Sequence, residues 1–429
     1  AKLIEARALL IAGKAPSDGV SQAVPYLEQA RILAQENGQR SLEGEIIRWL
    51  GNINFWQNNY EQSHTHLAEA LTIHREVGDF RGELSALNNL GQLFEVSGQL
   101  QKAIQFYEQA LDICQKIGDR LAEGVIFTNI GGLRTKLGHF AQAQGDLQRA
   151  LVIRSEIGND EGVAVVYHDL GDVFRHQGQY QCAISHYQKA VEINTRIQHA
   201  RQKGGVLTAL SVLYRDLGDY KLAREYVDRA LVELTDQDST HHIQALIEES
   251  MLNHMLGEYV QALTVAERAL AKSAELLPLQ AAAHKNAGHA LAGMQRWVGA
   301  QENYLIARDL LTRLGQHHLT AEPLAGLAHI ALINADLAAA SGFTEAIFDI
   351  IKKGALGGQD RRLWIYLICW KVMDKTGDSR RVELIEWAYA LLQHCADSIS
   401  EDTARAIYLE RIPENCRITE FWQGLHPSK

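Results

Sequence analysis

Apolar residues recur along the chain with a period close to 40 residues. One aromatic or aliphatic residue follows a predicted turn in each period: Val20, Tyr60, Leu100, Phe140, Tyr180, Tyr220, Tyr259, Trp297 and Leu337. An alanine follows ten residues later in the first eight periods: Ala30, Ala70, Ala110, Ala150, Ala190, Ala230, Ala269 and Ala307. Self-similarity at a fixed period is typical of a repeat architecture rather than of several globular domains.

A small residue lies nine positions before the recurrent apolar residue from the second period onward. These residues are Gly51, Gly91, Gly131, Gly171, Ser211, Ser250, Gly288 and Ala328. Small side chains at fixed positions allow two helices to approach closely. Each period should therefore contain a tight contact between two helices.

Each period also has helical apolar spacing twice over, with a glycine between the two stretches, as at Gly98, Gly138 and Gly178. We therefore expect an all-α fold, an α-solenoid of about ten antiparallel helical hairpins. Residues 1–345 are expected to form nine hairpins of 38–40 residues. Residues 346–429, where the pattern diverges, should form a last hairpin and capping helices that cover the end of the array.

Composition excludes several other classes of protein. The chain of 429 residues is 46% hydrophobic and 22% charged, so it should fold rather than remain disordered. Its formal net charge of −10 argues against nucleic acid as a partner. No apolar stretch approaches the ~20 residues needed to span a membrane, and the five cysteines show no framework of paired spacings. These features favour a cytoplasmic protein that does not enter a membrane, and a first residue Ala1 suggests a segment of a longer chain.

The pattern resembles the tetratricopeptide repeat (TPR). The small residue, the turn position and the two alanines of each period carry this resemblance. In the third period these are Gly91, Leu100, Ala103 and Ala110, preceded by Asn89 and Leu90. The 40-residue length and the missing terminal proline are similar to the repeats of kinesin light chains, Leu-Gly-Asn-repeat adaptors and bacterial regulators. The resemblance implies a right-handed superhelix that binds protein partners on its concave side.

The C-terminal sequence carries a second resemblance. Residues Leu409 to Asn415, followed by Phe421 and Trp422, are similar to the end of helical-repeat sensor arms in signal-transduction ATPases with numerous domains (STAND) and LuxR-type regulators. This resemblance implies that the chain is the sensing arm of a larger bacterial regulator, with a fused or associated ATPase or effector domain.

The TPR resemblance also implies which residues face the groove, because the family binds partners with the first helix of each hairpin. The candidate partner-binding residues are Arg48, Trp49, Asn52, Phe55, Ser85, Asn88, Asn89, Gln92, Glu95, Thr128, Asn129, His168, Asp169, Asp172, Arg175 and Arg215. The same positions in neighbouring hairpins are Thr135, Thr208, Gln244, Glu248, His254, Lys285, Asn286 and His289.

Two roles are open for several of these residues. Asn89 and Asn129 could bind the backbone of a peptide, or could hydrogen-bond between neighbouring helices of the stack. Trp49, Phe55 and Trp56 could form an anchor pocket or pack between helices. Arg48 with Asn52 is the nearest approach to a carboxylate clamp, but the next repeat offers no second cation.

No pattern of catalytic, cofactor or metal-binding residues emerges. The chain has no phosphate-binding loop, no dinucleotide fingerprint and no nucleophile elbow, and its paired histidines lack metal-ligand spacing. We therefore expect a non-catalytic module without cofactor or metal that binds a protein or peptide. The alternatives are a stand-alone scaffold that organises a complex and a sensor of a small-molecule inducer.

Overall fold

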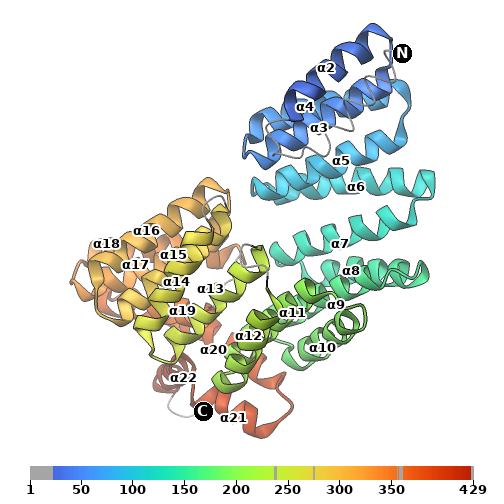
Figure 1. Cartoon of the computed structure of the whole chain (residues 1–429). Helices are drawn as coiled ribbons and strands as arrows, with labels where there is room; N and C mark the ends of the chain where they lie inside the picture. The colour runs from blue at the N-terminus through green and yellow to red at the C-terminus, as the bar shows by residue number, and fades with distance from the viewer. Residues whose placement is uncertain (1–22, 236–238, 274–275, 355, 357–360, 427–429) are drawn as a thin grey trace. The chain divides into compact units, whose positions relative to one another are not determined.

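The computed structural model describes residues 23–235, 239–273, 276–354, 356 and 361–426. The first helices of the hairpins are α3 (Arg40–Trp56), α5 (Phe80–Val96), α7 (Arg120–Lys136), α9 (Asp160–His176), α11 (Ala200–Asp216), α13 (Thr240–Met255), α15 (Leu277–Gly293) and α17 (Ala321–Ile333). The second helices are α2 (Ala23–Glu36), α4 (Tyr60–Val77), α6 (Leu100–Ile117), α8 (Phe140–Glu156), α10 (Tyr180–Arg196), α12 (Tyr220–Glu233), α14 (Tyr259–Lys272), α16 (Trp297–Arg313) and α18 (Leu337–Lys352). The predicted all-α array of helical hairpins is confirmed (Figure 1). Val20 and the expected first helix of the first hairpin lie outside the described residues.

The chain divides into two compact units. The N-terminal unit comprises residues 1–133 and 152–157, and the C-terminal unit comprises residues 134–151 and 158–429. Within the N-terminal unit the first helices α3 and α5 contact each other, and within the C-terminal unit α9, α11, α13, α15 and α17 contact one another in succession. In both units the first helices therefore form a continuous inner layer.

The small residue of each period does allow a close helix contact. A Cβ atom at Gly91 would lie 2.6 Å from the Tyr107 ring, and one at Gly171 would lie 2.5 Å from the Tyr187 ring. Both tyrosines are fully buried. In these hairpins a glycine on the first helix packs against a large side chain on the second, and no larger residue fits between them.

The predicted turn glycines adopt the left-handed conformation that ends a helix. Gly98 has φ of 71° and Gly178 has φ of 76°. At the equivalent position of two other hairpins, Asn58 and Ala335 adopt the same conformation, with φ of 60° and 58°. The turn is thus set by the repeat, and glycine is the residue that adopts it at least cost.

Four helices follow the last repeat: α19 (Arg362–Thr376), α20 (Arg381–Asp397), α21 (Asp402–Glu410) and α22 (Pro413–Leu425). We call residues 361–426 the C-terminal cap. The helices α21 and α22 follow the hairpin of α19 and α20, in the region where a last hairpin and capping helices were expected. The division at residue 345 stays a prediction, and α18 continues through it to Lys352.

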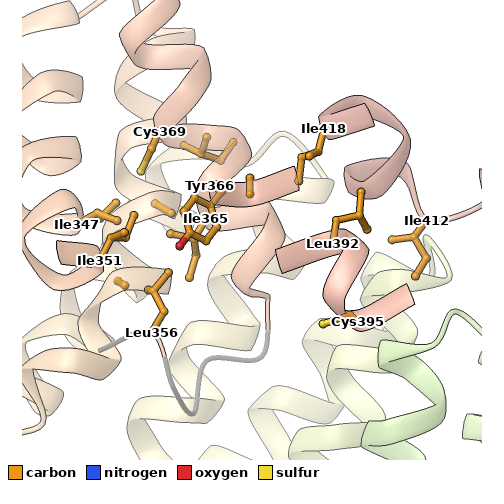
Figure 2. Close-up of a cluster of buried hydrophobic side chains, with 14 of the residues drawn as sticks. Ile347, Ile351, Leu356, Ile365, Tyr366, Cys369, Leu392, Cys395, Ile412 and Ile418 are labelled. Carbon is orange, nitrogen blue, oxygen red and sulfur yellow. The ribbon is translucent and has the colours of Figure 1, made fainter. Parts of the chain in front are cut away.

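The cap shares its core with the repeats. Ile347 and Ile351 of α18 pack with Ile365 and Cys369 of α19, in a cluster that continues to Ile418 of α22 (Figure 2). Within the C-terminal unit this buried cluster also includes residues of α10 to α12. The cap is therefore an integral part of the C-terminal unit.

The cap also binds the end of a helix about 200 residues earlier in the sequence. Arg362 donates to the carbonyl of His176 at 3.3 Å, His394 Nε2 donates to that of Gln177 at 2.8 Å, and Ser398 donates to that of Gly178. The last carbonyls of an α-helix have no partner within the helix. Side chains of the cap thus satisfy the C-terminal end of α9.

Candidate functional site

Inner-layer residues of four consecutive hairpins in the C-terminal unit surround one cavity of about 390 Å³. Eight of its lining residues are at the first-helix positions implied by the resemblance: His168, Asp172, Arg175, Thr208, Arg215, Gln244, Glu248 and Asn286. Ala209, Val212, Ile247 and Met251 add apolar surface. We call this cavity the groove. The register of the repeat thus brings together side chains that lie up to 118 residues apart.

An ion-pair network forms one wall of the groove. Arg215 NH1 donates to Glu248 Oε2 at 2.6 Å, and Ser211 donates to the other carboxylate oxygen at 3.2 Å. Asp216 accepts from both Arg215 and Arg175, each at 3.2 Å. The side chains of Arg215 and Glu248 are only 5% and 4% exposed, so each charge depends on its partner.

A second carboxylate, Asp172, lies one turn before Arg175. Tyr187 donates its hydroxyl to Asp172 Oδ1 at 2.5 Å, and His168 Nε2 is 4.0 Å from Oδ2. Burial would raise the pKa of Asp172, but the neighbouring His168 and Arg175 outweigh it and hold the pKa below its usual range. Asp172 therefore presents a stable negative charge at the α9 end of the groove.

Two polar atoms of the groove lining, on Asn286 and His241, are candidates for ligand contacts. Asn286 Nδ2 donates to the carbonyl of Ile247 at 2.7 Å, which fixes the orientation of the amide. Its Oδ1 is buried, as is Nδ1 of His241, and neither has a hydrogen-bond partner among the described residues. Because burial lowers the pKa of His241, this imidazole is neutral at pH 7. Buried polar atoms are nearly always bonded, so these two mark where a ligand or ordered water would bind.

The groove continues into a smaller cavity beneath the cap. This cavity has a volume of about 90 Å³ and shares Arg175, Arg215 and Met251 with the groove. Its far wall is formed by the cap, including Arg361, Arg362, Trp364 and Glu414. We call it the cap cavity. The cap therefore closes one side of the candidate site.

Five of the predicted positions in the C-terminal unit do not line the groove: Thr135, Asp169, His254, Lys285 and His289. His254 lies beside Arg361, whose guanidinium is 3.3 Å from His254 Nε2. His289 is buried, with its Nε2 2.9 Å from Glu322 and its Nδ1 2.8 Å from the Tyr304 hydroxyl.

This buried cluster adds Tyr304 and Glu322, which the sequence pattern did not reveal, to His289 and Lys285 of the predicted positions. Lys285 completes it by donating to Glu322 at 3.1 Å, and the Glu322 residue is fully buried. Burial lowers the pKa of His289 to about 4. The only sequence signal was a set of polar residues at otherwise apolar helical positions. The cluster joins α15, α16 and α17 and lies away from the groove lining.

In the N-terminal unit the inner-layer amides mostly bond to neighbouring helices. Asn89 donates to Asn52 Oδ1 at 2.6 Å, from α5 to α3. Asn129 is half-buried beside the Tyr107 hydroxyl. Asn88 differs, because its buried Oδ1 has no hydrogen-bond partner among the described residues. The structure thus gives Asn89 the interhelical role and keeps Asn88 as a candidate contact.

Hydroxyl groups at the predicted contact positions of the N-terminal unit bond within their own helices. Ser85 donates to the Arg81 carbonyl at 3.0 Å, and Thr128 donates to that of Gly124 at 2.8 Å. Thr128 is buried, whereas Gln92 is exposed and Glu95 half-buried. Of these predicted contacts, Gln92 is the one that is fully open to a partner.

The aromatic residues at the start of the array pack mainly on one another. The rings of Trp49 and Trp56 are 6.1 Å apart, as are those of Phe55 and Tyr60. The Arg48 guanidinium lies 5.4 Å from the Trp49 ring. The described cavity of this unit lies between α2, α3 and α4, and its lining includes none of these four aromatic residues. Their geometry therefore favours packing over an anchor pocket.

The described part of the chain contains neither a candidate metal site nor a candidate membrane-spanning helix. No group of three or more His, Cys, Asp or Glu side chains is arranged to hold a metal ion. None of the described helices is both long and apolar enough to cross a membrane.

Comparison with known proteins identifies the repeats. Models of the tetratricopeptide repeat match residues 42–116 and 123–196, and residues 205–231. No curated protein matches the sequence. Outside the matched ranges, the repeat is supported by the periodic sequence pattern and by the structure.

Several solved structures are similar to the chain. The apo quorum sensor NprR from B. thuringiensis is 13% identical with a TM-score of 0.53, over 82% of this chain and 97% of NprR. Apo RapI is 13% identical with a TM-score of 0.50, over 64% of this chain and 99% of RapI. A STAND protein with a TPR sensor from Pyrococcus horikoshii is 17% identical with a TM-score of 0.49, over 63% of this chain and 42% of that protein.

The likeness to NprR and RapI shows a shared fold, an array of helical hairpins. The family matches, the 40-residue period and the glycine-to-tyrosine contacts agree on the type of repeat. Residues 42–116, 123–196 and 205–231 are therefore tetratricopeptide repeats, and the described part of the chain has a helical-hairpin solenoid fold.

Proposed function

We propose that the chain is a non-catalytic module that binds a protein or peptide in the groove. The observation that supports it most is the open Asn286 Oδ1, which is buried, fixed in orientation and placed in the lining of a cavity of about 390 Å³. A peptide offers backbone N–H donors for such an acceptor, and the exposed amide of Gln244 can bind a backbone carbonyl. Val212, Ile247 and Met251 provide surface for an apolar side chain.

We further propose that the module is the ligand-sensing arm of a larger bacterial signalling regulator in the cytoplasm. NprR is a quorum sensor with the same fold, and the Pyrococcus protein has a TPR sensor in a STAND protein. A fold by itself does not determine function, so the proposal rests on the groove and on the resemblance of residues 409–422 to such arms. The five cysteines are free, which favours a reducing compartment.

A sensor of a small-molecule inducer is the second candidate, and the cap cavity favours it. This cavity lies between repeats and cap and combines charged with apolar lining, as small-molecule sites do. A ligand there would touch both the inner layer and the cap.

The proposed function is tested by blocking the groove. Gln244 is exposed, so Gln244→Trp should fold and fill the cavity, and Gln261→Trp on exposed α14 surface is the matched control. Both variants and the wild type are incubated with a pool of random hexapeptides, and bound peptides are measured by mass spectrometry. We expect the wild type and the control to retain the same peptides and Gln244→Trp to lose them.

Equal retention by all three proteins would place binding outside the groove and contradict the proposal. Retention by none of them would favour a scaffold that needs a folded partner.

A further inference from the structure

The cap cavity contains more positive than negative charge from its own lining. Arg175, Arg215, Arg361 and Arg362 line it together with the carboxylates of Asp216 and Glu414. Buried charges of one sign are costly unless they are paired. The pairing of each guanidinium therefore decides whether the cavity can hold an anion.

Three of the four guanidinium groups are already neutralised. Arg175 pairs with Asp216, Arg215 with Asp216 and Glu248, and Arg361 with Glu414. The side chains of Arg175 and Arg361 are 14% and 12% exposed, so these pairs are well shielded from solvent. They form the fixed wall of the cavity.

Arg362 is the exception. Among the described residues no carboxylate lies within ion-pair distance of Arg362, and its recorded hydrogen bond is one donation to the His176 carbonyl at 3.3 Å. A guanidinium has five N–H donors in a planar fork that matches a carboxylate. Most of the donors of Arg362 are therefore available to a ligand in the cavity that this residue lines.

The start of α19 adds to this positive potential. Arg362, Leu363 and Trp364 form its first turn and all line the cavity, and this turn contains no acidic residue. No side chain caps the helix at Arg361. Free N–H groups at a helix N-terminus favour an anion.

The cavity is also apolar beyond the arginines. Leu363, Trp364, Met255 and Ile412 contribute to its lining. A volume of about 90 Å³ is more than one water needs and suits a carboxylate with a short apolar body.

We propose that the cap cavity is a carboxylate-binding subsite, in which Arg362 pairs with the carboxylate of a ligand whose apolar part packs on Trp364 and Ile412. The inference rests on the proposed sensing function and names the ligand chemistry of the same site. The carboxylate belongs either to a small organic acid or to the C-terminus of a peptide that lies in the groove. Because Arg362 also binds the end of α9, the ligand joins the cap to the repeats and strengthens cap docking.

The first test uses three probes with the same apolar body and different charge. Phenylacetate, phenylacetamide and phenethylamine are each titrated into the full chain, with thermal unfolding and amide hydrogen exchange as readouts. We expect phenylacetate alone to raise Tm and to protect α19 and the end of α9 from exchange. Arg362→Gln should weaken the apparent Kd about tenfold, since one charge-assisted hydrogen-bonded pair is lost.

Two further variants separate binding from folding. Arg308→Gln removes an exposed arginine of α16 that pairs with Asp309, and it should bind like the wild type. Arg362→Lys keeps the charge without the fork and should bind with intermediate affinity. Equal effects of all three probes, or an unchanged Kd in Arg362→Gln, would overturn the subsite.

A second test distinguishes the two sources of the carboxylate and separates this proposal from the proposed function. The hexapeptide pool is offered with free and with amidated C-termini to wild type, to Arg362→Gln and to Gln244→Trp. A peptide terminus is supported if the wild type selectively retains the free-acid pool and Arg362→Gln abolishes this retention. A small acid is supported if phenylacetate binds but the wild type does not prefer free over amidated peptides. A third outcome is that both pools bind alike, that Gln244→Trp abolishes this binding, and that phenylacetate has no effect. In that case the proposal of groove binding stands and the carboxylate subsite is wrong.

Discussion

The inner layers of the two units have the same register and different contents. In the N-terminal unit, Asn89 bonds to Asn52 and Thr128 to its own helix, so polar groups mostly hold the stack together. In the C-terminal unit, Arg175, Arg215 and Glu248 surround a cavity of about 390 Å³. The repeat determines which positions face inward. The residues at those positions determine whether the inner layer is filled by hydrogen bonds between helices or leaves a cavity.

Glu248→Ala should have the largest effect on stability, and only in the C-terminal unit. It leaves Arg215, which is 5% exposed, without its closest partner, and breaking a buried ion pair typically costs about 3–5 kcal/mol. We expect the free energy of unfolding of the C-terminal unit to fall by about this amount, measured by urea unfolding with hydrogen exchange to locate the loss. An unchanged midpoint would mean that Asp216 alone suffices for Arg215.

Acidification should also affect the C-terminal unit through His289. Its pKa of about 4 in the folded chain lies below the value of about 6.5 for an unfolded chain. As pH falls, the unfolded chain therefore takes up the proton first, and stability present above pH ~6.5 is lost down to pH ~4. The shift corresponds to about 3 kcal/mol, measurable as the pH dependence of unfolding.

The matched variants for this prediction are His289→Gln and His64→Gln. His64→Gln, at an exposed position of α4, is the surface control. His289→Gln should flatten the profile between these pH values. A wild-type profile that stays flat would show that His289 is not buried as neutral imidazole.

Gly91→Ala and Gly171→Ala test whether the two units share the same helix contact within a hairpin. The added methyl group would clash with the Tyr107 ring in one unit and the Tyr187 ring in the other. Overpacking of this kind costs about 1–3 kcal/mol, and we expect similar losses of unfolding free energy at the two sites. Strongly unequal losses would indicate that the hairpins differ in their helix contact as well as in their inner layer.

Asn89→Ala should have the smallest effect. It removes one half-buried hydrogen bond to Asn52, which is worth about 1 kcal/mol, and it does not touch the groove. Peptide retention by the variant, measured with the hexapeptide pool, should match that of the wild type. Loss of retention would restore the peptide-binding role of Asn89 and extend the site into the N-terminal unit.

Much of the fold could be predicted because its determinants are local and periodic. Gly91, Gly98 and Ala110 define the helix contact, the turn and the core of one hairpin within 20 residues of sequence. The contact of Arg362 with His176 could not be predicted, because it spans 186 residues and has no repeat to mark it. The bounds of α22 could not be predicted for a similar reason, since its partners α19 and α20 diverge from the pattern.

The candidate site was predicted in part. Register identified Arg175 and Arg215 as inward-facing, but it identified Asn89 and Thr128 equally. The cavity depends on side-chain size, pairing and burial in three dimensions, which the sequence pattern does not contain. The proposed subsite around Arg362 depends on the cap and was outside the predicted set altogether.

The contact between the cap and α9 has a consequence for synthesis on the ribosome. Ser398, which binds the Gly178 carbonyl, is translated 220 residues after it. At 5–20 residues per second, roughly 10–40 s pass before the partner exists. During this interval water must solvate the last carbonyls of α9 while successive hairpins stack on their neighbours. Docking of the cap is therefore expected to be a late folding event, and a ribosome stalled before residue 361 should present α9 with its C-terminal end uncovered.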